Sequence, residues 1–317
     1  MNENELKFPL RFFDIDGQSV KDNYEFFNEK DVETITKRFD ITENYLRWKE
    51  AILNGFNGIV FDEPNHKYFV DGVEYKAVSY VLHEFVKPVD WNTIKKNFAA
   101  KNGVEISQVD KWWKINNFIA TNTGTKVHNF AESCFYFYTG QTDKVLDSNK
   151  DQLEGINGFR YFIPTRNKEI AVCKFWNDML KVPGLVPMLS EAKVHTRDLP
   201  NLRNYCGTFD LLFYYNNPQK GIEGVFIFDY KTNSKPLIDD NARKFNKFLL
   251  EPFDGMYDDA FSHYTLQLSL YQIPIEKILG IPVLGRRLVY LKDDGTYEIM
   301  QLEDKTDALT EALKIEE

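Results

Sequence analysis

The pattern of apolar and polar positions divides the chain into a helical start, a short β-rich stretch and a long region where helices and strands alternate. Over residues 31–56, apolar side chains recur at near-helical spacing, which predicts a packing helix. Beyond it the pattern changes to short alternating runs, separated by turn residues such as Pro64 and Gly72. We therefore expect residues 1–115 to form an N-terminal helical region with a β-hairpin or small meander at about 58–82.

The centre of the chain is predicted to be helical. One helix is expected to begin near Thr123 and to end at Gly140, since glycine commonly follows the last turn of a helix. A second helix is expected over residues 151–180, after which Pro183 and Pro187 break the chain.

Strand-like segments dominate the next part of the sequence. Three apolar segments follow one another, and a turn-rich sequence joins the second to the third. A helix, two further strand-like runs and a closing acidic helix complete the chain. The strands are expected at 188–196, 205–215, 224–232, 286–294 and 296–302, and the longer helix at 261–279. This order predicts an α/β fold, with helices flanking a mixed central sheet, over residues 116–317.

Composition is that of an ordinary globular protein, with 43% hydrophobic and 27% charged residues among 317. No apolar run approaches the roughly 20 residues that cross a bilayer, and the N-terminus lacks a signal-peptide profile. We therefore expect a cytoplasmic protein without a membrane partner. Cys134, Cys173 and Cys206 are too few and too widely spaced for a four-cysteine cluster and are interpreted as buried thiols.

A net charge of −9 argues at first against a protein that binds phosphate backbones. Affinity for DNA depends, however, on where basic residues cluster, and carboxylates gathered around a cation add negative charge locally. Modest, salt-sensitive binding is therefore expected. Residues 91–113 mix lysine with aromatic side chains, which suits a single-strand contact surface. A partly buried amphipathic helix is the other interpretation, and the pattern favours it.

Candidate chemistry lies at the end of the apolar segment 224–232, which closes with Asp229-Tyr230-Lys231. Side chains two apart on a strand share a face, so Asp229 and Lys231 would address one phosphate while Tyr230 points away. A hairpin would bring Asp210 of the preceding strand alongside, and two carboxylates on adjacent strands make a cation site. The acid-x-lysine triplet recurs elsewhere in the chain, so exposed charges at a strand end remain the alternative.

A divalent cation would meet the needs of phosphodiester hydrolysis. Mg²⁺ or Mn²⁺ takes oxygen ligands, neutralises the phosphate and lowers the pKa of water, so that hydroxide forms near neutrality. Lys231 is expected beside the attacking water, where it would position the water or stabilise the developing charge.

The sequences GTFD at 207–210 and FDYK at 228–231 resemble the core of the PD-(D/E)XK nucleases, which share a restriction-endonuclease-like fold. Further motifs are similar to the RecB-like and phage-type exonuclease branch of this superfamily. Gly124 and Thr125 precede His128 as in the helix that supplies a histidine ligand there, and Glu132 follows on the same helical face. A packed or solvated histidine is the alternative for His128.

Two other positions extend the resemblance. Glu191 lies 19 residues before Asp210, where the branch carries a glutamate on its first core strand, although a strand-edge carboxylate is the alternative. Gln267 and Tyr271 match a Q-x-x-x-Y pattern on a helix. There they would hold the catalytic carboxylate, Lys231 or the DNA backbone, while packing in the core is the alternative for Tyr271. The matches run in order from residue 66 to about residue 290.

The resemblance implies a complete site. The metal ligands would be His128, Glu191, Asp210, Asp229 and the backbone carbonyl of Tyr230. The catalytic set would be Lys231, Asp229, Asp210, Glu191, Gln267 and Tyr271. The chain departs from the family pattern where Phe209 replaces the proline before the first acid and where the second acid is aspartate, and neither change removes a ligand.

The expected function is a Mg²⁺- or Mn²⁺-dependent DNA nuclease, with an exonuclease of recombination, repair or phage DNA processing favoured. No cysteine quartet and no phosphate-binding loop occur, so neither an iron-sulfur cluster nor ATP is expected. The alternatives are a structure- or site-specific endonuclease and a non-cutting DNA-binding protein on the same fold. The expected partner is single- or double-stranded DNA. A recombinase, a single-strand-binding protein, a helicase and a homo-oligomer are further candidates.

Overall fold

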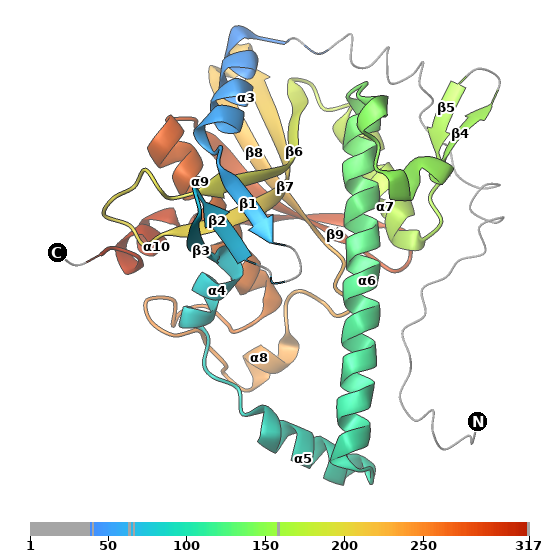
Figure 1. The fold of residues 1–317 in the computed structure, drawn as a ribbon, viewed down its shortest axis with the longest axis vertical. Coiled ribbons are helices and arrows are strands. Elements are labelled where there is room, and N and C mark those ends of the chain that lie inside the picture. The colour runs from blue at the N-terminus through green and yellow to red at the C-terminus, as the bar shows by residue number, and fades with distance from the viewer. Residues whose placement is uncertain (1–38, 40, 63–64, 66, 157–158, 316–317) are drawn as a thin grey trace.

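The computed structural model describes residues 39, 41–62, 65, 67–156 and 159–315, and it places helices on both faces of a mixed β-sheet (Figure 1). This confirms the predicted α/β class. Part of the first predicted helix, residues 31–38, lies outside the described residues. Among those described, no helix combines the length and the apolar character that crossing a bilayer requires.

Among the residues that the structure describes, the sheet has eight strands: β1-β2-β3-β7-β8-β9-β10 follow one another in this order, and β6 also pairs with β7. Of these described pairs, β3–β7 and β8–β9 are parallel and the others are antiparallel. The strands are β1 Ile59–Asp62, β2 Lys67–Val70, β3 Val73–Ala77, β6 Leu185–His195, β7 Tyr205–Asn217, β8 Ile222–Lys231, β9 Val283–Leu291 and β10 Tyr297–Leu302. All five predicted strands of the second half are therefore confirmed, and the predicted N-terminal meander joins the same sheet through β3.

The helices begin and end at residues suited to those positions. The Asp259 carboxylate accepts a hydrogen bond from the Ser262 N–H at the start of α9, and Gly280 ends that helix with a φ of 63°. The helices are α3 Glu43–Gly55, α4 Val78–Leu82, α5 Trp91–Asn102, α6 Ile106–Tyr138, α7 Asn167–Met179, α8 Asp240–Lys244, α9 Ala260–Leu279 and α10 Thr306–Ala312. Short 3₁₀ turns occur at His83–Phe85, Thr142–Lys144, Asp147–Gln152 and Pro218–Lys220.

Two apolar layers bury the faces of the sheet. One gathers side chains of α3, α4, α9 and α10 against the sheet, and the other gathers those of α6 and α7. Side chains of β7 alternate between the two layers, with Leu212 and Tyr214 in the first and Leu211 and Phe213 in the second. Because β7 is buried from both sides, an acid within it needs a specific partner.

The segment 151–180 differs from the prediction of a single helix. Strands β4, Leu153–Ile156, and β5, Phe159–Phe162, form a separate two-stranded hairpin, and the α-helix α7 begins after it at Asn167. Aromatic residues at alternate positions favour a strand, and Pro164 disfavours helical backbone at the residue before it.

Helix α6 also differs, because it begins at Ile106 instead of near Thr123, and the expected domain boundary at residue 115 falls inside it. Its glycine is a packing position and not a helix start. A Cβ on Gly124 would lie 3.3 Å from the Thr232 hydroxyl, so the missing side chain lets α6 approach the end of β8.

Candidate metal centre

Three carboxylates lie in a row across three neighbouring strands. In β6, Ser190 pairs with Leu211 and Ala192 with Phe209, which sets Glu191 across from Asp210 of β7. On the other side Leu211 pairs with Phe228 of β8, and continuing this antiparallel register by one residue sets Asp210 across from Asp229. Residues directly opposite on adjacent strands have side chains within contact distance. The sheet therefore brings together the acids that the sequence singled out, although up to 38 residues separate them along the chain.

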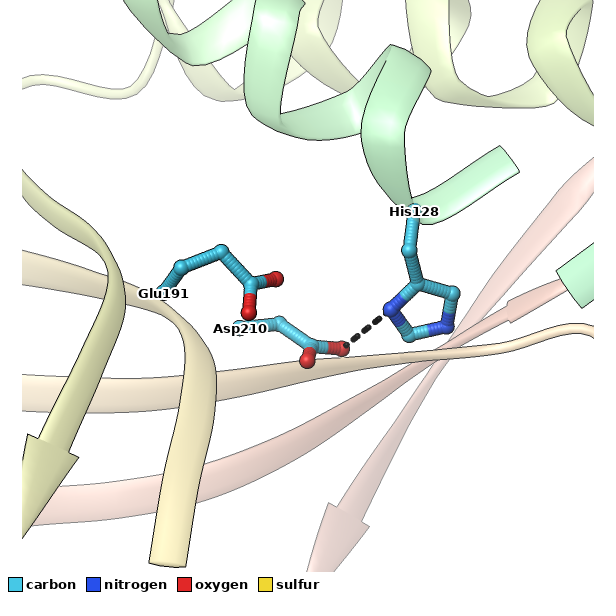
Figure 2. A group of neighbouring side chains, drawn as sticks. All are labelled: His128, Glu191 and Asp210. Atoms are coloured by element: carbon cyan, nitrogen blue, oxygen red, sulfur yellow. Dashed lines mark ion pairs between the residues drawn. The ribbon is translucent and has the colours of Figure 1, made fainter. Parts of the chain in front are cut away.

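Glu191 has an unusual backbone conformation for a strand residue. Its φ is 51°, in the left-handed region that side chains other than glycine seldom adopt. The neighbouring Ser190 hydroxyl donates a hydrogen bond of 3.0 Å to the Asp210 carbonyl and so ties β6 to β7 at this point. The surrounding structure thus maintains a strained residue where its carboxylate meets that of Asp210 (Figure 2).

His128 reaches the row from helix α6. Its Nδ1 lies 3.4 Å from Oδ2 of Asp210. One ligand atom each from His128, Glu191 and Asp210 lies within 4.8 Å of the other two (Figure 2). Two oxygens and one imidazole nitrogen at this spacing are a donor set that a divalent cation could join. Three of the ligands predicted from the sequence therefore converge.

Asp229 and Lys231 form an ion pair beside this group. The Lys231 ammonium also lies 4.0 Å from the centre of the Tyr264 ring. The Asp229 carboxylate is thus paired with Lys231 and is not part of the group of three. Both side chains share one face of β8, as predicted, whereas the Tyr230 ring lies in the opposite layer against Phe175.

The Tyr230 backbone contributes to the site through its N–H, which donates a 2.6 Å hydrogen bond to Oδ2 of Asp210. The same carboxylate oxygen faces His128, so Asp210 is held by two donors of different elements. The Tyr230 carbonyl stays a predicted ligand.

Burial and the neighbouring charges shift the pKa values of His128 and Glu191. Burial would lower the pKa of His128, but the Asp210 carboxylate, with help from Glu191 and Asp229, outweighs burial and raises the pKa to about 9. For Glu191, burial and then the charge of Asp210 raise the pKa well above its ordinary value. At neutral pH the histidine is therefore a cation that partly neutralises the row of acids.

The pKa values of the two buried aspartates are shifted in opposite directions. Burial and then Asp210 raise the pKa of Asp229 to about 6, against the opposing effect of Lys231. Burial would raise the pKa of Asp210 as well, but His128 and Lys231 outweigh it and lower the pKa. Burial would lower the pKa of Lys231, yet its acidic neighbours raise it, so the amine is protonated at neutral pH.

Gln267 and Tyr271 lie at the edge of the site. The Gln267 amide donates a 2.7 Å hydrogen bond to the Tyr271 hydroxyl, and both side chains line a cavity of about 390 Å³ together with Gly207. A Cβ on Gly207 would lie 2.3 Å from the Tyr271 ring, so glycine is required for this contact. In the described structure Gln267 and Tyr271 contact each other, and the Tyr271 ring packs against Gly207 of β7. A role of this pair toward Lys231 or DNA stays a prediction.

Tyr264 was not predicted from the sequence. It precedes Gln267 by three residues and Tyr271 by seven on α9, so all three share a helical face. That spacing was the available signal. Glu132, one turn after His128 on α6, accepts a 3.2 Å hydrogen bond from the Tyr136 hydroxyl, and burial raises its pKa. Its charge is also among the influences that raise the pKa of Glu191, so it lies near the site as expected.

Metal binding should release a proton from His128. Because the metal-free pKa is about 9, a cation that binds this nitrogen must displace the proton throughout the neutral range. Affinity should therefore rise roughly tenfold per pH unit from pH ~7 until His128 titrates. Calorimetry in buffers of different ionisation enthalpy should give at least the proton of His128 released at pH ~7.5, with any proton on Glu191 adding to it. Affinity independent of pH in this range would contradict the assignment of His128 as ligand.

Glu191→Gly should stabilise the metal-free protein. The change relieves a left-handed conformation that costs roughly 1 to 3 kcal/mol, against a glycine penalty of roughly 0.5 to 1 kcal/mol. It also removes a carboxylate that burial and Asp210 disfavour in its charged form. Thermal melting in EDTA should show a higher midpoint, whereas the further stabilisation by Mn²⁺ should shrink. Glu191→Ala, which keeps the strain, is the matched control and should gain less.

No protein-family model matches the chain, and no curated protein matches it. The chemistry of the site therefore rests on its own geometry and charges.

Proposed function

We propose that this protein is a metal-dependent DNA nuclease with a PD-(D/E)XK core of the RecB-like type. The observation that supports this most directly is the meeting of His128, Glu191 and Asp210 within 4.8 Å of one another, next to the Asp229–Lys231 pair. A cation site with an ammonium group on the adjoining strand is what hydrolysis of a phosphodiester needs.

The donor set fits a hard divalent cation. Burial, and then the charge of Asp210, raise the pKa values of Glu191 and Asp229, so the charged forms of these acids are disfavoured, and a cation would offset both effects. His128, Glu191 and Asp210 would hold Mg²⁺ or Mn²⁺, with Asp229 and the Tyr230 carbonyl as further ligands. The bound ion would neutralise the phosphate and lower the pKa of the attacking water.

Lys231 supplies positive charge that does not depend on the cation. Its raised pKa keeps it protonated, so it acts by hydrogen bonding and charge and not as a general base. Asp229 and the Tyr264 ring hold the ammonium in place. From there it would orient the attacking water and stabilise charge on the phosphate oxygens.

Space for a polynucleotide adjoins the site in two directions. A cavity of about 570 Å³ is lined by Gly124, one turn from His128, and by Thr232, the residue after Lys231. The cavity beside Gln267 and Tyr271 lies toward Gly207 on β7. A strand that crosses the centre would occupy both. We favour an exonuclease over an endonuclease, in recombination, repair or phage DNA processing.

The test is cleavage of linear and closed circular DNA by the wild-type protein with Mg²⁺ or Mn²⁺. Degradation of linear DNA with circular DNA left intact is expected, since an exonuclease requires an end. Defined fragments from the circle would indicate an endonuclease instead. If neither DNA is cut with either metal, the nuclease proposal fails, and DNA binding without cleavage would support a non-cutting protein.

A further inference from the structure

Helix α5 and residues 106–126 of α6 form an arm, residues 91–126, whose outer part extends away from the sheet (Figure 1). We propose that this arm binds single-stranded DNA and leads it along α6 to the metal centre. This inference rests on the proposed function, because it names the form of DNA that the site receives.

The arm is held together by its own aromatic core. Phe98 of α5 stacks on Trp112 of α6 with ring centres 5.7 Å apart, and Trp91 meets Trp113 edge to face at 5.9 Å. Val109 is fully buried between the helices. The amphipathic packing favoured from the sequence is therefore present, and it leaves other aromatic surface uncovered.

Apolar side chains remain exposed on the outside of this core. Phe118 is 69% exposed, more than any other large hydrophobic residue that the structure describes, and Trp91 is 59% exposed. Exposed aromatic rings are platforms on which unpaired bases stack, at roughly 1 to 3 kcal/mol per base. Bases inside a duplex do not present their faces in this way, so the rings favour a single strand.

The charge of the arm is opposite to that of the remaining chain. Residues 91–126 contain six lysines and two acids, a formal charge of +4, so the rest of the −9 chain carries −13. Lys95 pairs with Asp110 at 2.6 Å. The other five lysines are exposed and make no ion pair with a described residue: Lys96, Lys101, Lys111, Lys114 and Lys126. A polyanion is the complementary partner, whereas protein interfaces are depleted in lysine.

One stripe of α6 connects the arm to the site. Lys114, Phe118 and Thr121 follow at intervals of four and three residues, and His128 lies seven further on, so the four side chains share a helical face. Phe118 is ~15 Å along the axis from His128 at the usual helical rise. Thr121 lines the cavity of about 570 Å³ that reaches to Thr232 beside Lys231. The stripe therefore runs from the exposed ring of Phe118, past the cavity beside Thr121, to the proposed metal ligand His128.

The test measures binding of a fluorescent thymidine oligonucleotide by anisotropy in EDTA, where no cleavage occurs. Phe118→Ala should weaken binding roughly fivefold to 150-fold. Lys111→Gln with Lys114→Gln should weaken binding and lower the slope of log affinity against log salt by ~1.4, the value for two phosphate contacts on a single strand. Exposed residues on other elements provide matched controls: Leu53→Ala on α3, and Lys220→Gln with Lys277→Gln.

A small substrate separates this inference from the nuclease proposal. Thymidine 5′-p-nitrophenyl phosphate is too short to reach Phe118, so its hydrolysis should be unchanged in the arm variants, while kcat/KM on long single strands falls. If the wild-type protein cuts DNA but the arm variants bind and cut single strands like the wild type, the inference fails and the proposed function stands.

If the arm variants have the melting temperature of the wild type but bind the oligonucleotide more weakly, the inference is supported even if no cleavage is found. Equal loss of affinity in the control variants would overturn it, and so would binding of a protein partner by an arm that does not bind the oligonucleotide.

Discussion

Lys231→Ala should lower the rate of DNA cleavage at saturating metal by ~10²- to 10⁴-fold, the usual contribution of a positioned proton-transfer or charge-stabilising group. Metal affinity should be retained, because the Lys231 ammonium and the cation compete for the Asp229 carboxylate, and the substitution removes the ammonium. The measurement pairs single-turnover cleavage with Mn²⁺ titration of each protein.

Lys305→Ala is a matched control, because Lys305 pairs with Glu303 two residues away on the surface, in the same acid-x-lysine pattern. It should cleave like the wild type. A Lys231→Ala protein that binds Mn²⁺ and cuts at the wild-type rate would remove Lys231 from the mechanism. Loss of both binding and cleavage would assign it a structural role instead.

Asp210→Asn should abolish cleavage and reduce metal affinity more than any other single change in the site. Asp210 is the central acid of the row, and its Oδ2 faces both His128 and the Tyr230 N–H. Asparagine keeps the shape and one acceptor oxygen but removes the charge. We expect cleavage to fall by more than ~10³-fold, since removal of one partner from a charge-stabilising unit commonly costs that much.

The same variant should change the titration of His128. The Asp210 charge is the main influence that raises this pKa to about 9, so the pKa should fall in Asp210→Asn. In the wild type, the stability from the raised pKa is fully present below pH ~6.5 and is lost as pH rises through about 9. The variant should lack that loss, which NMR titration and melting against pH would detect. Asp198→Asn, at an exposed loop position, is the control and should titrate like the wild type.

Apolar positions that repeat every two residues in strands and every 3.6 residues in helices were enough to predict much of the fold. The apolar strands that carry Asp210 and Asp229 could be recognised because β7 and β8 are buried on both faces and admit few polar residues. Their hairpin then predicted that the two acids are neighbours, and Leu211 and Phe228, the residues next to them, are paired across the two strands.

Other features depend on packing that the sequence does not display. Helix α6 extends through Gly124, where a Cβ would lie 3.3 Å from the Thr232 hydroxyl, so the close approach to the end of β8 favours glycine despite its low helix propensity. The strained φ of Glu191 cannot be predicted from its neighbours, since the backbone adopts it only between strands already paired. Lys231 was expected beside water, but its packing against Tyr264 depends on the position of α9.

Helix α6 carries exposed Phe118 and, ten residues further along, His128, without a break between them. Because a continuous helix is stiff over ten residues, a tilt at Phe118 would also move His128. If a strand bound on Phe118 shifts His128 so that the affinity for the cation rises, thermodynamic reciprocity requires the cation to raise the affinity for the strand by the same factor. Substrate would then help to recruit its own cofactor, and a protein without DNA would hold the ion less tightly.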